Sequence, residues 1–412
     1  MIHNTIKDSD QEIGNLITQE TVRQNNELEL IASENYVSPA VLEALSSPLA
    51  NKYSEGYPGK RYYGGNGVID EVEKLAQERA KKLFGAEHVN VQPLSGSPAN
   101  AAIYLAMLKP GDTVMGLRLD HGGHLSHGHP INFSGLLYNF VQYRLGQNGL
   151  VDMEQVREIA LANKPAMIVA GFSAYSREID WEGFKKIADE VGALTMADIS
   201  HPAGLIAAGE LSNPVPFFDI VMTTTHKTLR GPRGAIIMCK EQHAKAIDRA
   251  VFPGIQGGPH DHVTAAKAVA FNEALQPEFK TYAKQVIANA KIMAKIFMDN
   301  NYTIVSGGTD NHLLVIDLQN KNLSGKEAER ILEEIGISVS RSTVPNDPNP
   351  PLNPSGIRLG TPAITTRGFR EKETEEVIRI IIKALQNSQN TDELMECKKM
   401  ISELCLRYPL PY

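Results

Sequence analysis

The sequence predicts an α/β fold in which a large domain, built on a mostly parallel sheet wrapped by helices, is followed by a smaller α+β domain. Two observations predict it. Between about residues 65 and 275, short apolar runs suited to buried strands alternate with runs whose apolar residues recur at helical spacing. Polar side chains capable of chemistry follow several of these strands, at the end where open parallel sheets bind ligands.

The large domain is predicted to cover residues 31–278, after a polar, helix-prone N-terminal arm at residues 1–30. Its first helix has apolar side chains on one face, at positions 68, 72, 75, 76, 80 and 83. Short apolar runs predict buried strands at residues 113–117, 167–170, 194–197 and 218–222. Helices are expected between and after them, at residues 181–191 and 263–275.

The small C-terminal domain is predicted to cover residues 279–412 and has a different pattern. A long helix at about residues 279–301 leads into it. Strands are expected at residues 312–317 and 337–340, on either side of a helix at 325–334. A proline-rich loop at 344–354 and two helices, at 373–385 and 392–406, complete it.

Composition excludes several classes of function. The 412 residues carry 41 basic and 48 acidic side chains, and the net charge of −7 argues against nucleic acid as a partner. No apolar run reaches membrane-spanning length, and the polar N-terminus lacks the apolar core of a signal peptide. Three cysteines without paired spacing, Cys239, Cys397 and Cys405, predict structural thiols in the reducing cytoplasm.

The most informative residues are Lys227 and Asp198. Lys227 follows the apolar run at 218–222 and three threonines, where partial desolvation would lower the pKa of its amine and make it a nucleophile for aldehydes. Asp198 ends the preceding strand, and a buried carboxylate there can hold a pyridinium N–H. The ordered pair favours an enzyme that uses pyridoxal phosphate (PLP).

A turn upstream fits a phosphate group. Ser95, Gly96 and Ser97 precede a predicted helix, with Ser97 as the expected N-cap and Pro98 in the first turn. The N–H groups of a helix N-terminus attract anions, although a capped helix without a ligand is the commoner meaning of such a turn. The sequence has no glycine-rich fingerprint for a dinucleotide or a nucleoside triphosphate.

Four histidines within nine positions, His121, His124, His127 and His129, raise the alternative of a metal site. Only Asp120 lies beside them as a further oxygen ligand, and no cysteine is near. A Gly-Gly pair at 122–123 would interrupt any helical face that presented them together. We therefore expect no metal.

Taken together, the motifs closely resemble those of serine hydroxymethyltransferases, which are fold-type I PLP-dependent transferases. The resemblance runs nearly end to end, through LIASEN at 30–35, the segment 53–65, SGS at 95–97, HGGHL at 121–125, GFSAY at 171–175, TTTHK at 223–227 with GPRG at 231–234, QGGP at 256–259 and GIRLGTP at 356–362. It implies reversible conversion of L-serine and tetrahydrofolate into glycine and 5,10-methylenetetrahydrofolate. This reaction belongs to one-carbon metabolism and glycine biosynthesis, and retro-aldol cleavage of β-hydroxy amino acids is the implied side activity.

The resemblance also implies roles for particular residues at the cofactor. Lys227 would hold PLP as a Schiff base, Asp198 would pair with the pyridine nitrogen, and His124 would stack on the ring. The other implied PLP contacts are Ser95, Gly96, Ser97, Ser173, His201, Thr224, Tyr53, Gly257 and Gly258. His226, next to the lysine, is implied to be catalytic, together with Lys227, His124, Glu55 and Tyr63.

Further residues are implied to contact the substrates. Arg358 would hold the amino-acid carboxylate in its planar fork, with support from Ser33. Glu55 would transfer a proton at the substrate hydroxyl and at the folate, since a carboxyl group among tyrosines and glycines can stay protonated near neutrality. Tyr62 and Tyr63 would line the same pocket.

The folate site implied by the resemblance consists of Leu119, Gly123, His124, Leu125 and Glu55. The chain departs from the family pattern nearby. Ser342 stands where an asparagine is common, and residues 350–352 replace a Ser-Pro-Phe sequence. These changes leave the form of the pterin carrier open, and they keep a folate-independent aldolase for threonine-like amino acids as the alternative enzyme.

In this family the tyrosine segment and Gly257-Gly258 enter the active site of the other subunit. The resemblance therefore implies a homodimer with shared active sites, while the sequence does not separate a dimer from a tetramer. A catalytically silent binding protein of the same fold is the alternative from another class. It is disfavoured because Lys227, Asp198 and Arg358 are all present.

Overall fold

A seven-stranded sheet forms the centre of the larger part of the chain. The computed structural model describes residues 2–412, with side chains from residue 6 onward. The strand order is β4-β10-β9-β8-β7-β5-β6. The strands are β4 (His88–Asn90), β5 (Thr113–Leu117), β6 (Asn139–Tyr143), β7 (Met167–Gly171), β8 (Leu194–Asp198), β9 (Ile220–Thr224) and β10 (Ala235–Cys239). Neighbours from β9 to β6 are parallel, whereas β10 is antiparallel to both β4 and β9.

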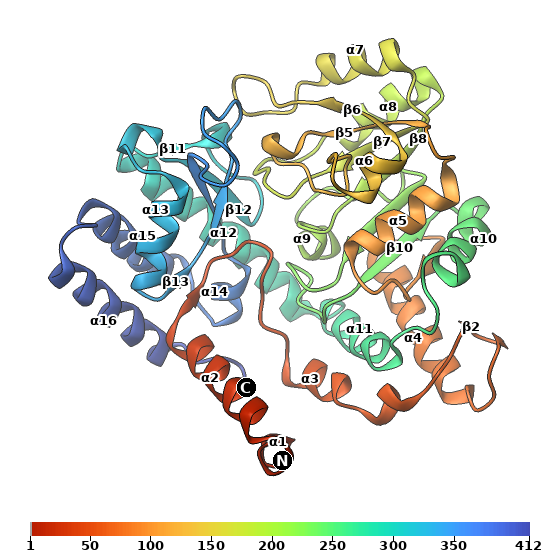
Figure 1. Cartoon of the computed structure of the whole chain (residues 1–412), viewed down its shortest axis with the longest axis horizontal. Helices are drawn as coiled ribbons and strands as arrows, with labels where there is room; N and C mark the ends of the chain where they lie inside the picture. Colours follow the sequence, from red (N-terminus) through yellow and green to blue (C-terminus); the bar gives the residue numbers. More distant parts are fainter. Residues whose placement is uncertain (1) are drawn as a thin grey trace.

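Helices cover both faces of this sheet (Figure 1). In β7, Ile168 and Ala170 belong to one hydrophobic cluster, while Met167 and Val169 belong to another on the opposite face. This alternation is expected of a central strand that is buried on both sides. The surrounding helices include α4 (Gly67–Phe84), α5 (Gly96–Met107), α7 (Met153–Asn163), α8 (Trp181–Val191), α9 (Ala203–Ala207), α10 (Glu241–Arg249) and α11 (Asp261–Ala274).

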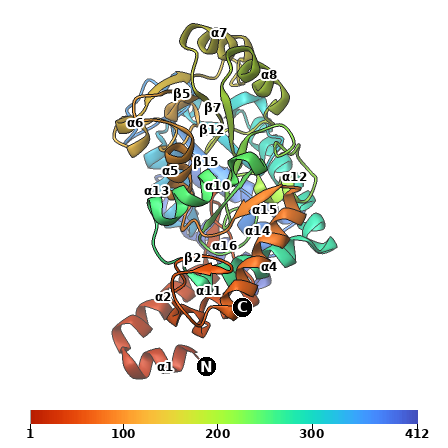
Figure 2. The same ribbon diagram turned by 90° about the vertical axis from the view of Figure 1, so that its right-hand side faces the viewer.

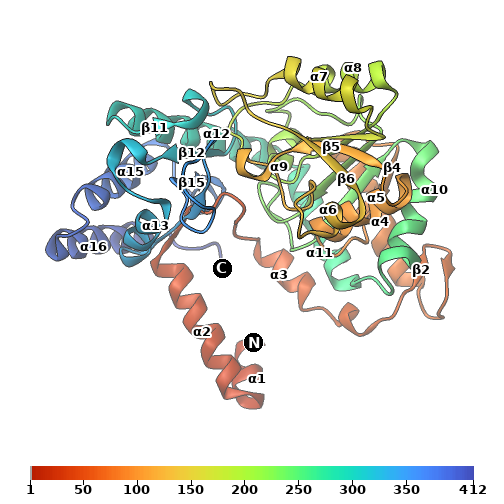
Figure 3. The ribbon, with the colours of Figure 1, turned by 45° about the horizontal axis from the view of Figure 1, so that its top comes forward.

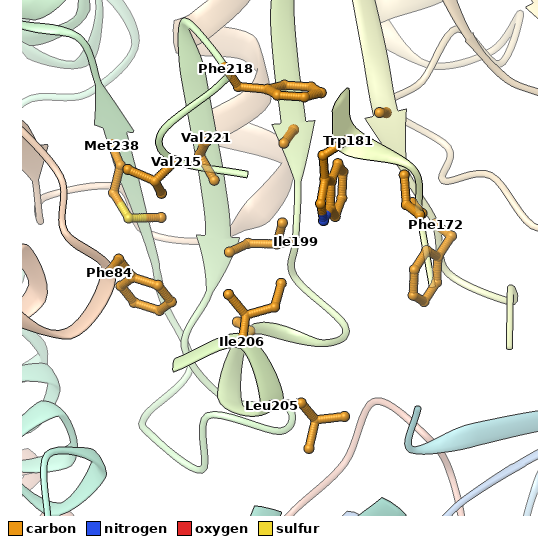
Figure 4. Packing of buried hydrophobic residues seen from close by; sticks show 14 of the residues in the cluster. Phe84, Phe172, Trp181, Ile199, Leu205, Ile206, Val215, Phe218, Val221 and Met238 are labelled. Atoms are coloured by element: carbon orange, nitrogen blue, oxygen red, sulfur yellow. The ribbon is translucent and has the colours of Figure 1, made fainter. Parts of the chain in front are cut away.

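Aromatic packing anchors α8 to one face of the sheet. Trp181, the first residue of α8, packs edge-on against Phe218, with ring centroids 5.6 Å apart (Figure 4). Phe218 lies in the loop before β9, and this explains why the predicted strand at 218–222 begins two residues too early. At its other end β9 continues into Thr223 and Thr224, which are buried despite their hydroxyl groups. Apolar patterning does not signal buried threonines.

A second, four-stranded antiparallel sheet lies in the C-terminal part, with order β11-β12-β15-β14. Its strands are β11 (Thr303–Ile304), β12 (Leu313–Asp317), β14 (Ser340–Ser342) and β15 (Gly356–Gly360). Three helices accompany it, α13 (Gly325–Glu334), α15 (Glu371–Gln386) and α16 (Thr391–Arg407). The helix at 325–334 is thus confirmed with its predicted bounds, and its start carries a capping box between Ser324 and Glu327.

The single strand expected at 337–340 is wrong, because this segment divides between two sheets. β13 (Ile337–Ser338) pairs in parallel with β1 (Leu28–Glu29), and β14 begins two residues later in the four-stranded sheet. Leu28 and Leu30 are fully buried in the hydrophobic cluster of the C-terminal part. The end of the N-terminal arm therefore supplies both a strand and core residues to the region around residue 337.

One long helix, α12 (Pro277–Asp299), connects the two cores (Figure 3). Phe279 and Val286 in its first half join the core of the large sheet. Met293 and Phe297 in its second half join the core of the small sheet. The helix therefore packs against both of the sheets that carry residues of the site described below. The domain limits at residues 30 and 278 stay predictions.

The N-terminal helices α1 (Ile2–Ser9) and α2 (Gln11–Asn26) extend away from both sheets (Figure 2, Figure 3). Apolar side chains on α2 face solvent, among them Ile13 at 48%, Leu16 at 58% and Val22 at 53% exposure. A groove of about 850 Å³ runs between α2, α3 (Pro39–Leu45) and Tyr412. Across residues 2–412, no helix is both long and apolar enough to cross a membrane.

Candidate active site

The candidate site lies where β7, β8 and β9 end. Asp198 is the last residue of β8, Lys227 follows the end of β9, and Ser173 follows the end of β7. A small cavity at these ends is lined by Gly96, Asn100, His124, Phe172, Ser173, Asp198, Ser200, Thr224 and Lys227. The cavity thus brings together six of the twelve residues that the sequence assigned to the cofactor, namely Gly96, His124, Ser173, Asp198, Thr224 and Lys227.

The Lys227 side chain is buried, with 9% of its surface exposed. Its amine donates no hydrogen bond to any side chain or carbonyl among the residues that the structure describes. Burial, opposed by the charge of Asp198 and assisted by the charges of Arg358 and Arg233, lowers the pKa of this amine to about 8. Near neutrality a sizeable fraction is therefore the free base, which is the form that attacks a carbonyl carbon.

Asp198 is held by three donors. Its Oδ2 accepts hydrogen bonds from His127 Nε2 at 3.0 Å and Asn100 Nδ2 at 3.2 Å, and its Oδ1 accepts one from the Ser200 amide at 3.1 Å. Burial alone would raise the pKa of this carboxyl, but the hydrogen bond and charge of His127, helped by His124 and Ser200, keep the pKa well below its ordinary value. Asp198 is therefore an anion throughout the neutral range.

His124 lies in the same network as a neutral ring. Its Nδ1 accepts from the Ser126 amide at 3.1 Å and lies 2.7 Å from the Ser126 hydroxyl, so the ring proton belongs on Nε2. Burial, followed by the charge of His127, lowers the pKa of His124 to about 4. Asn100 donates to the same hydroxyl at 2.8 Å and so links His124 to Asp198.

His127, Asn100 and Ser126 are functional candidates that sequence reasoning did not assign. In the sequence, His127 was considered only as one of four possible metal ligands. In the structure His127 is 1% exposed and bonded to Asp198, whereas the Nδ1 of His121 accepts from the Leu145 amide. Among the described side chains, no three His, Cys, Asp or Glu residues are arranged to hold a metal ion.

The predicted phosphate turn starts a helix, but one residue of that prediction is wrong. The N-cap of α5 is Ser95 rather than Ser97, and its hydroxyl makes no capping hydrogen bond. A Cβ atom at Gly96 would lie 2.9 Å from Thr224 Cγ2, so the turn passes close to the end of β9. The side chain of Gln256, the residue before Gly257, connects its loop to the segment that precedes this turn. It accepts a hydrogen bond from the Leu94 amide and donates one to the Gln92 carbonyl, both at 3.0 Å.

Arg358 on β15 crosses from the small sheet and donates to the Ser173 carbonyl. Its Nε atom is enclosed and has no partner among the described residues, and no described carboxylate lies within ion-pair distance of it. Burial lowers the pKa of this guanidinium to about 10, so it remains a cation. An enclosed cation with a free donor is suited to an anionic ligand such as a carboxylate.

Ser33 is brought toward the same strand by the packing of the preceding residues. The Gly360 amide donates to the Leu30 carbonyl at 2.8 Å, and a Cβ at Gly360 would lie 2.5 Å from Ala32 Cα. Only glycine permits this close approach of the two backbones. The segment that carries Ser33 therefore lies directly against the strand that carries Arg358.

His201 is buried beside the cavity and paired with a residue from the other sheet. Its Nδ1 lies 3.1 Å from Nε2 of His312, the residue just before β12, and the two rings are stacked with centroids 5.4 Å apart. Burial lowers the pKa of His312 to about 3 and that of His201 well below its ordinary value. His226 is also kept neutral, because burial lowers its pKa to about 3, and its Nδ1 has no partner among the described residues.

Glu55 and the tyrosines form a separate cluster. The rings of Tyr53 and Tyr63 lie 5.2 Å apart, and Tyr62 packs on Phe252 at 5.6 Å. A Cβ at Gly257 would lie 3.2 Å from Glu55 Oε1, and one at Gly258 would lie 3.2 Å from the Tyr53 ring. The hairpin of β2 (Gly56–Tyr57) and β3 (Lys60–Arg61) lies at the outer edge, on the side away from the small sheet (Figure 1, Figure 3). Among the described side chains, no hydrogen bond or ring contact joins this cluster to Lys227.

Four of the five residues expected at the folate lie on the loop after β5, whereas Glu55 belongs to the separate cluster described above. Leu119 lines a cavity of about 320 Å³ together with Arg118, Asp120, His129, Pro130, Gln142, Thr343 and Pro351. Leu125 is 44% exposed, and a Cβ at Gly123 would lie 2.1 Å from the Leu117 carbonyl oxygen. Of the departures from the family pattern, the Ser342 hydroxyl donates to the Thr343 carbonyl and Leu352 is 84% exposed.

A sequence model of one protein family, described as serine hydroxymethyltransferase, matches residues 6–381. The chain belongs to the serine hydroxymethyltransferase family. This family consists of PLP-dependent transferases of fold-type I that interconvert serine and glycine with tetrahydrofolate. The family assignment and the predicted α/β fold class are thereby confirmed, and the mostly parallel seven-stranded sheet agrees with them.

The residues at the strand ends fit the cofactor of the family. Lys227 offers a buried amine with no described hydrogen-bond partner, and Asp198 offers a carboxylate that stays charged. His124 adds a flat neutral ring to the same cavity, and Gly96 at the N-terminus of α5 also lines it. A buried amine and carboxylate in one cavity are the groups that a pyridine aldehyde with a phosphate requires.

Proposed function

We propose that this chain catalyses the reversible reaction of L-serine with tetrahydrofolate to give glycine and 5,10-methylenetetrahydrofolate, with slower cleavage of other β-hydroxy amino acids. One observation carries the proposal. The enclosed Nε of Arg358 has no described partner, and it shares the site with a Lys227 amine that has none either. The Arg358 guanidinium can bind the carboxylate of an amino acid, and the amine beside it can bind the aldehyde of PLP. This pair of groups suits a PLP enzyme that acts on an amino acid.

The cofactor contacts follow from the cavity. Lys227 would hold PLP covalently, Asp198 would keep the ring nitrogen protonated, and His124 would cover one face of the ring. The phosphate would lie at the α5 N-terminus near Ser95, Gly96 and Ser97. When bound, PLP supplies an electron sink for the bond that breaks at the amino-acid α-carbon.

Arg358 would decide which bond breaks. Its guanidinium is anchored on the Ser173 carbonyl, so its remaining donors have a defined direction. When its carboxylate is held bidentately, the amino acid cannot rotate freely about the bond between its amino nitrogen and its α-carbon. Of the three α-carbon bonds that do not go to nitrogen, this restriction leaves one aligned for cleavage. Ser33, held against β15, would supply a second contact to the carboxylate.

We further propose that Glu55 moves the proton of the substrate hydroxyl, with Tyr63 beside it, and that both act in the site of a second copy. The Glu55 cluster does not touch the Lys227 cluster within one chain, yet its tyrosines are exposed, Tyr53 at 55%, Tyr62 at 74% and Tyr63 at 49%. Large exposed aromatic side chains are typical of interfaces. A homodimer with shared sites would cover them and complete each site.

The reaction is tested by following glycine formation from serine by the PLP-loaded protein, with and without tetrahydrofolate. Formation that requires tetrahydrofolate supports the proposal. Equal rates in its presence and absence, with faster cleavage of threonine, would instead assign the folate-independent aldolase, whose case rests on Ser342 and the exposed Leu352.

Subunit mixing tests the shared site. As homodimers, the Lys227→Ala variant should be inactive and the Glu55→Gln variant should keep only a small, measurable fraction of wild-type activity. If the sites are shared, a mixture that exchanges subunits recovers up to about one quarter of wild-type activity, because half the dimers are mixed and half of their sites contain neither substitution. If each chain supplies both residues to its own site, mixing recovers nothing.

Location and partners rest on less direct support. Cys239, Cys397 and Cys405 are buried free thiols, as expected of a protein in a reducing compartment, and we propose the cytoplasm. The net charge of −7 supports small-molecule substrates rather than nucleic acid.

A further inference from the structure

Arg61 is the most fully engaged charged side chain near the Glu55 cluster. It lies on β3, next to the exposed Lys60, yet its side chain is only 4% exposed. Its Nη1 donates to the carbonyls of Ser54 and Gly56, both at 2.8 Å. These are the residues immediately before and after Glu55. One guanidinium nitrogen therefore holds the chain on both sides of the proposed proton-transfer residue.

Other bonds complete the control of this backbone. The carbonyl of Glu55 itself accepts from the Tyr62 amide at 3.0 Å, and the Gly56 carbonyl also accepts from Gln92 Nε2 at 2.9 Å. Gly56 adopts a φ of +99°, and a Cβ there would lie 2.3 Å from the Lys60 carbonyl oxygen, so only glycine fits. With three successive carbonyls bonded, Glu55 keeps only its side-chain torsions free.

Two carboxylates fix the position of the Arg61 guanidinium. Its Nε donates to Asp70 at 2.9 Å and its Nη2 donates to Glu73 at 2.7 Å, and the Glu73 side chain is 2% exposed. Both carboxylates lie on α4, which packs against α11 in the body of the subunit. Arg61 thus transmits the position of a rigid helix to the backbone at Glu55. A lysine has a single nitrogen and cannot bond two carbonyls and two carboxylates in this fixed fork.

We propose that Arg61 is the positioning residue for Glu55, fixing its backbone through the flanking carbonyls so that its carboxyl is aimed at the substrate hydroxyl. This inference rests on the proton-transfer role proposed above for Glu55. Arg61 does not touch the substrate and acts only through Glu55. Its loss should therefore slow the chemical step without weakening the hold of Arg358 on the substrate carboxylate.

The test is a double-mutant cycle between Arg61→Lys and Glu55→Gln, with kcat and the KM for serine measured in PLP-loaded protein. A misplaced catalytic group costs about 10- to 100-fold. We expect Arg61→Lys to lower kcat by that factor while the KM changes by less than about twofold, and to have no further effect in the Glu55→Gln background. An equal loss of kcat in both backgrounds would show that Arg61 serves the fold alone and would overturn the proposal.

Two further variants guard against trivial results. Arg79→Lys is the matched control, because Arg79 lies on α4, the helix that carries the carboxylate partners of Arg61, and donates to the carbonyl of Ala268, away from Glu55. It should leave kcat unchanged. If Arg61→Lys does not fold, Arg61→Met combined with Glu73→Gln removes the guanidinium without leaving a charged carboxylate buried and alone.

A readout independent of activity separates this proposal from the proposed function. Hydrogen exchange at the Tyr62 amide, which bonds the Glu55 carbonyl, should become faster in Arg61→Lys and stay unchanged in Arg79→Lys. Unchanged exchange would overturn the positioning role of Arg61 even in an inactive protein. A wild-type protein without folate-dependent activity, or a fully active Glu55→Gln variant, would overturn the proposed function. Faster exchange in Arg61→Lys would still support the positioning role in either case.

Discussion

The acidity of the Lys227 amine should be unusual, and two substitutions should move it in opposite directions. Burial lowers its pKa to about 8, from an ordinary value of 10.5. At pH 7.5 a group of pKa 8 is about 24% neutral, whereas a group of pKa 10.5 is about 0.1% neutral, a difference of about 240-fold in reactive amine. Removing the Asp198 charge withdraws a stabilising anion and should lower the pKa further, whereas removing the Arg358 charge should raise it.

Competitive reductive methylation of the cofactor-free protein measures this directly. Short pulses at pH values from about 6 to 10, followed by peptide mass spectrometry, give the labelling rates of Lys227 and of Lys284, whose side chain is 70% exposed. The labelling rate of Lys227 should level off above about pH 8. The level should be reached at lower pH in Asp198→Asn and at higher pH in Arg358→Leu. The reasoning fails if Lys227 titrates together with Lys284, or if Asp198→Asn moves its curve to higher pH.

Three further outcomes are expected. Arg358→Leu should raise the KM for serine by about 30- to 1,000-fold, with Arg358→Lys in between and the thermal midpoint unchanged, because the loss of an enclosed charge partner costs about 2–4 kcal/mol; an unchanged KM would place the carboxylate elsewhere. His127→Phe should destabilise the protein by about 3–5 kcal/mol in urea denaturation and weaken PLP retention, because Asp198 loses a buried hydrogen-bond partner. His127→Gln can still donate a hydrogen bond, so this variant should lose less stability. Trp181→Ala should lower the free energy of unfolding by about 3–5 kcal/mol, because it leaves a cavity against Phe218. The molecules that remain folded should have an unchanged kcat. A large loss of kcat would show that this core controls the site.

Local apolar patterns predicted several elements of both parts of the chain with correct bounds. The strand at 113–117 and the helices at 181–191 and 325–334 have their predicted bounds, because each has a strong apolar pattern with clear flanking residues. The end of β8 at Asp198 and the position of Lys227 after β9 followed from the same apolar runs. Errors arose where tertiary contacts override the pattern, as in the division of residues 337–340 between two sheets.

The network around Asp198 shows what a single sequence cannot predict. His127 and Asn100 reach the carboxylate across 71 and 98 positions of the chain, and Ser126 joins them only because its hydroxyl meets the His124 ring. Nothing in the spacing of these residues marks them as partners. They can be sought only by a physical requirement, because a buried carboxylate at a strand end needs hydrogen-bond donors. The candidates for these donors are polar residues near the other strand ends and the α5 N-terminus.

The two clusters of the proposed site are held by different means, and this difference has consequences for substitutions. Lys227 and Asp198 are fixed by the central sheet, so their positions are tied to the main hydrophobic core. Glu55 directly precedes the β2–β3 hairpin, and the carbonyls on either side of it are bonded to Arg61, which pairs with the buried Glu73. Buried ion pairs contribute little net stability compared with apolar packing, but they can specify a geometry. Conservative changes in that charged cluster should therefore reduce the rate before they reduce the stability, whereas changes beneath the sheet should do the reverse.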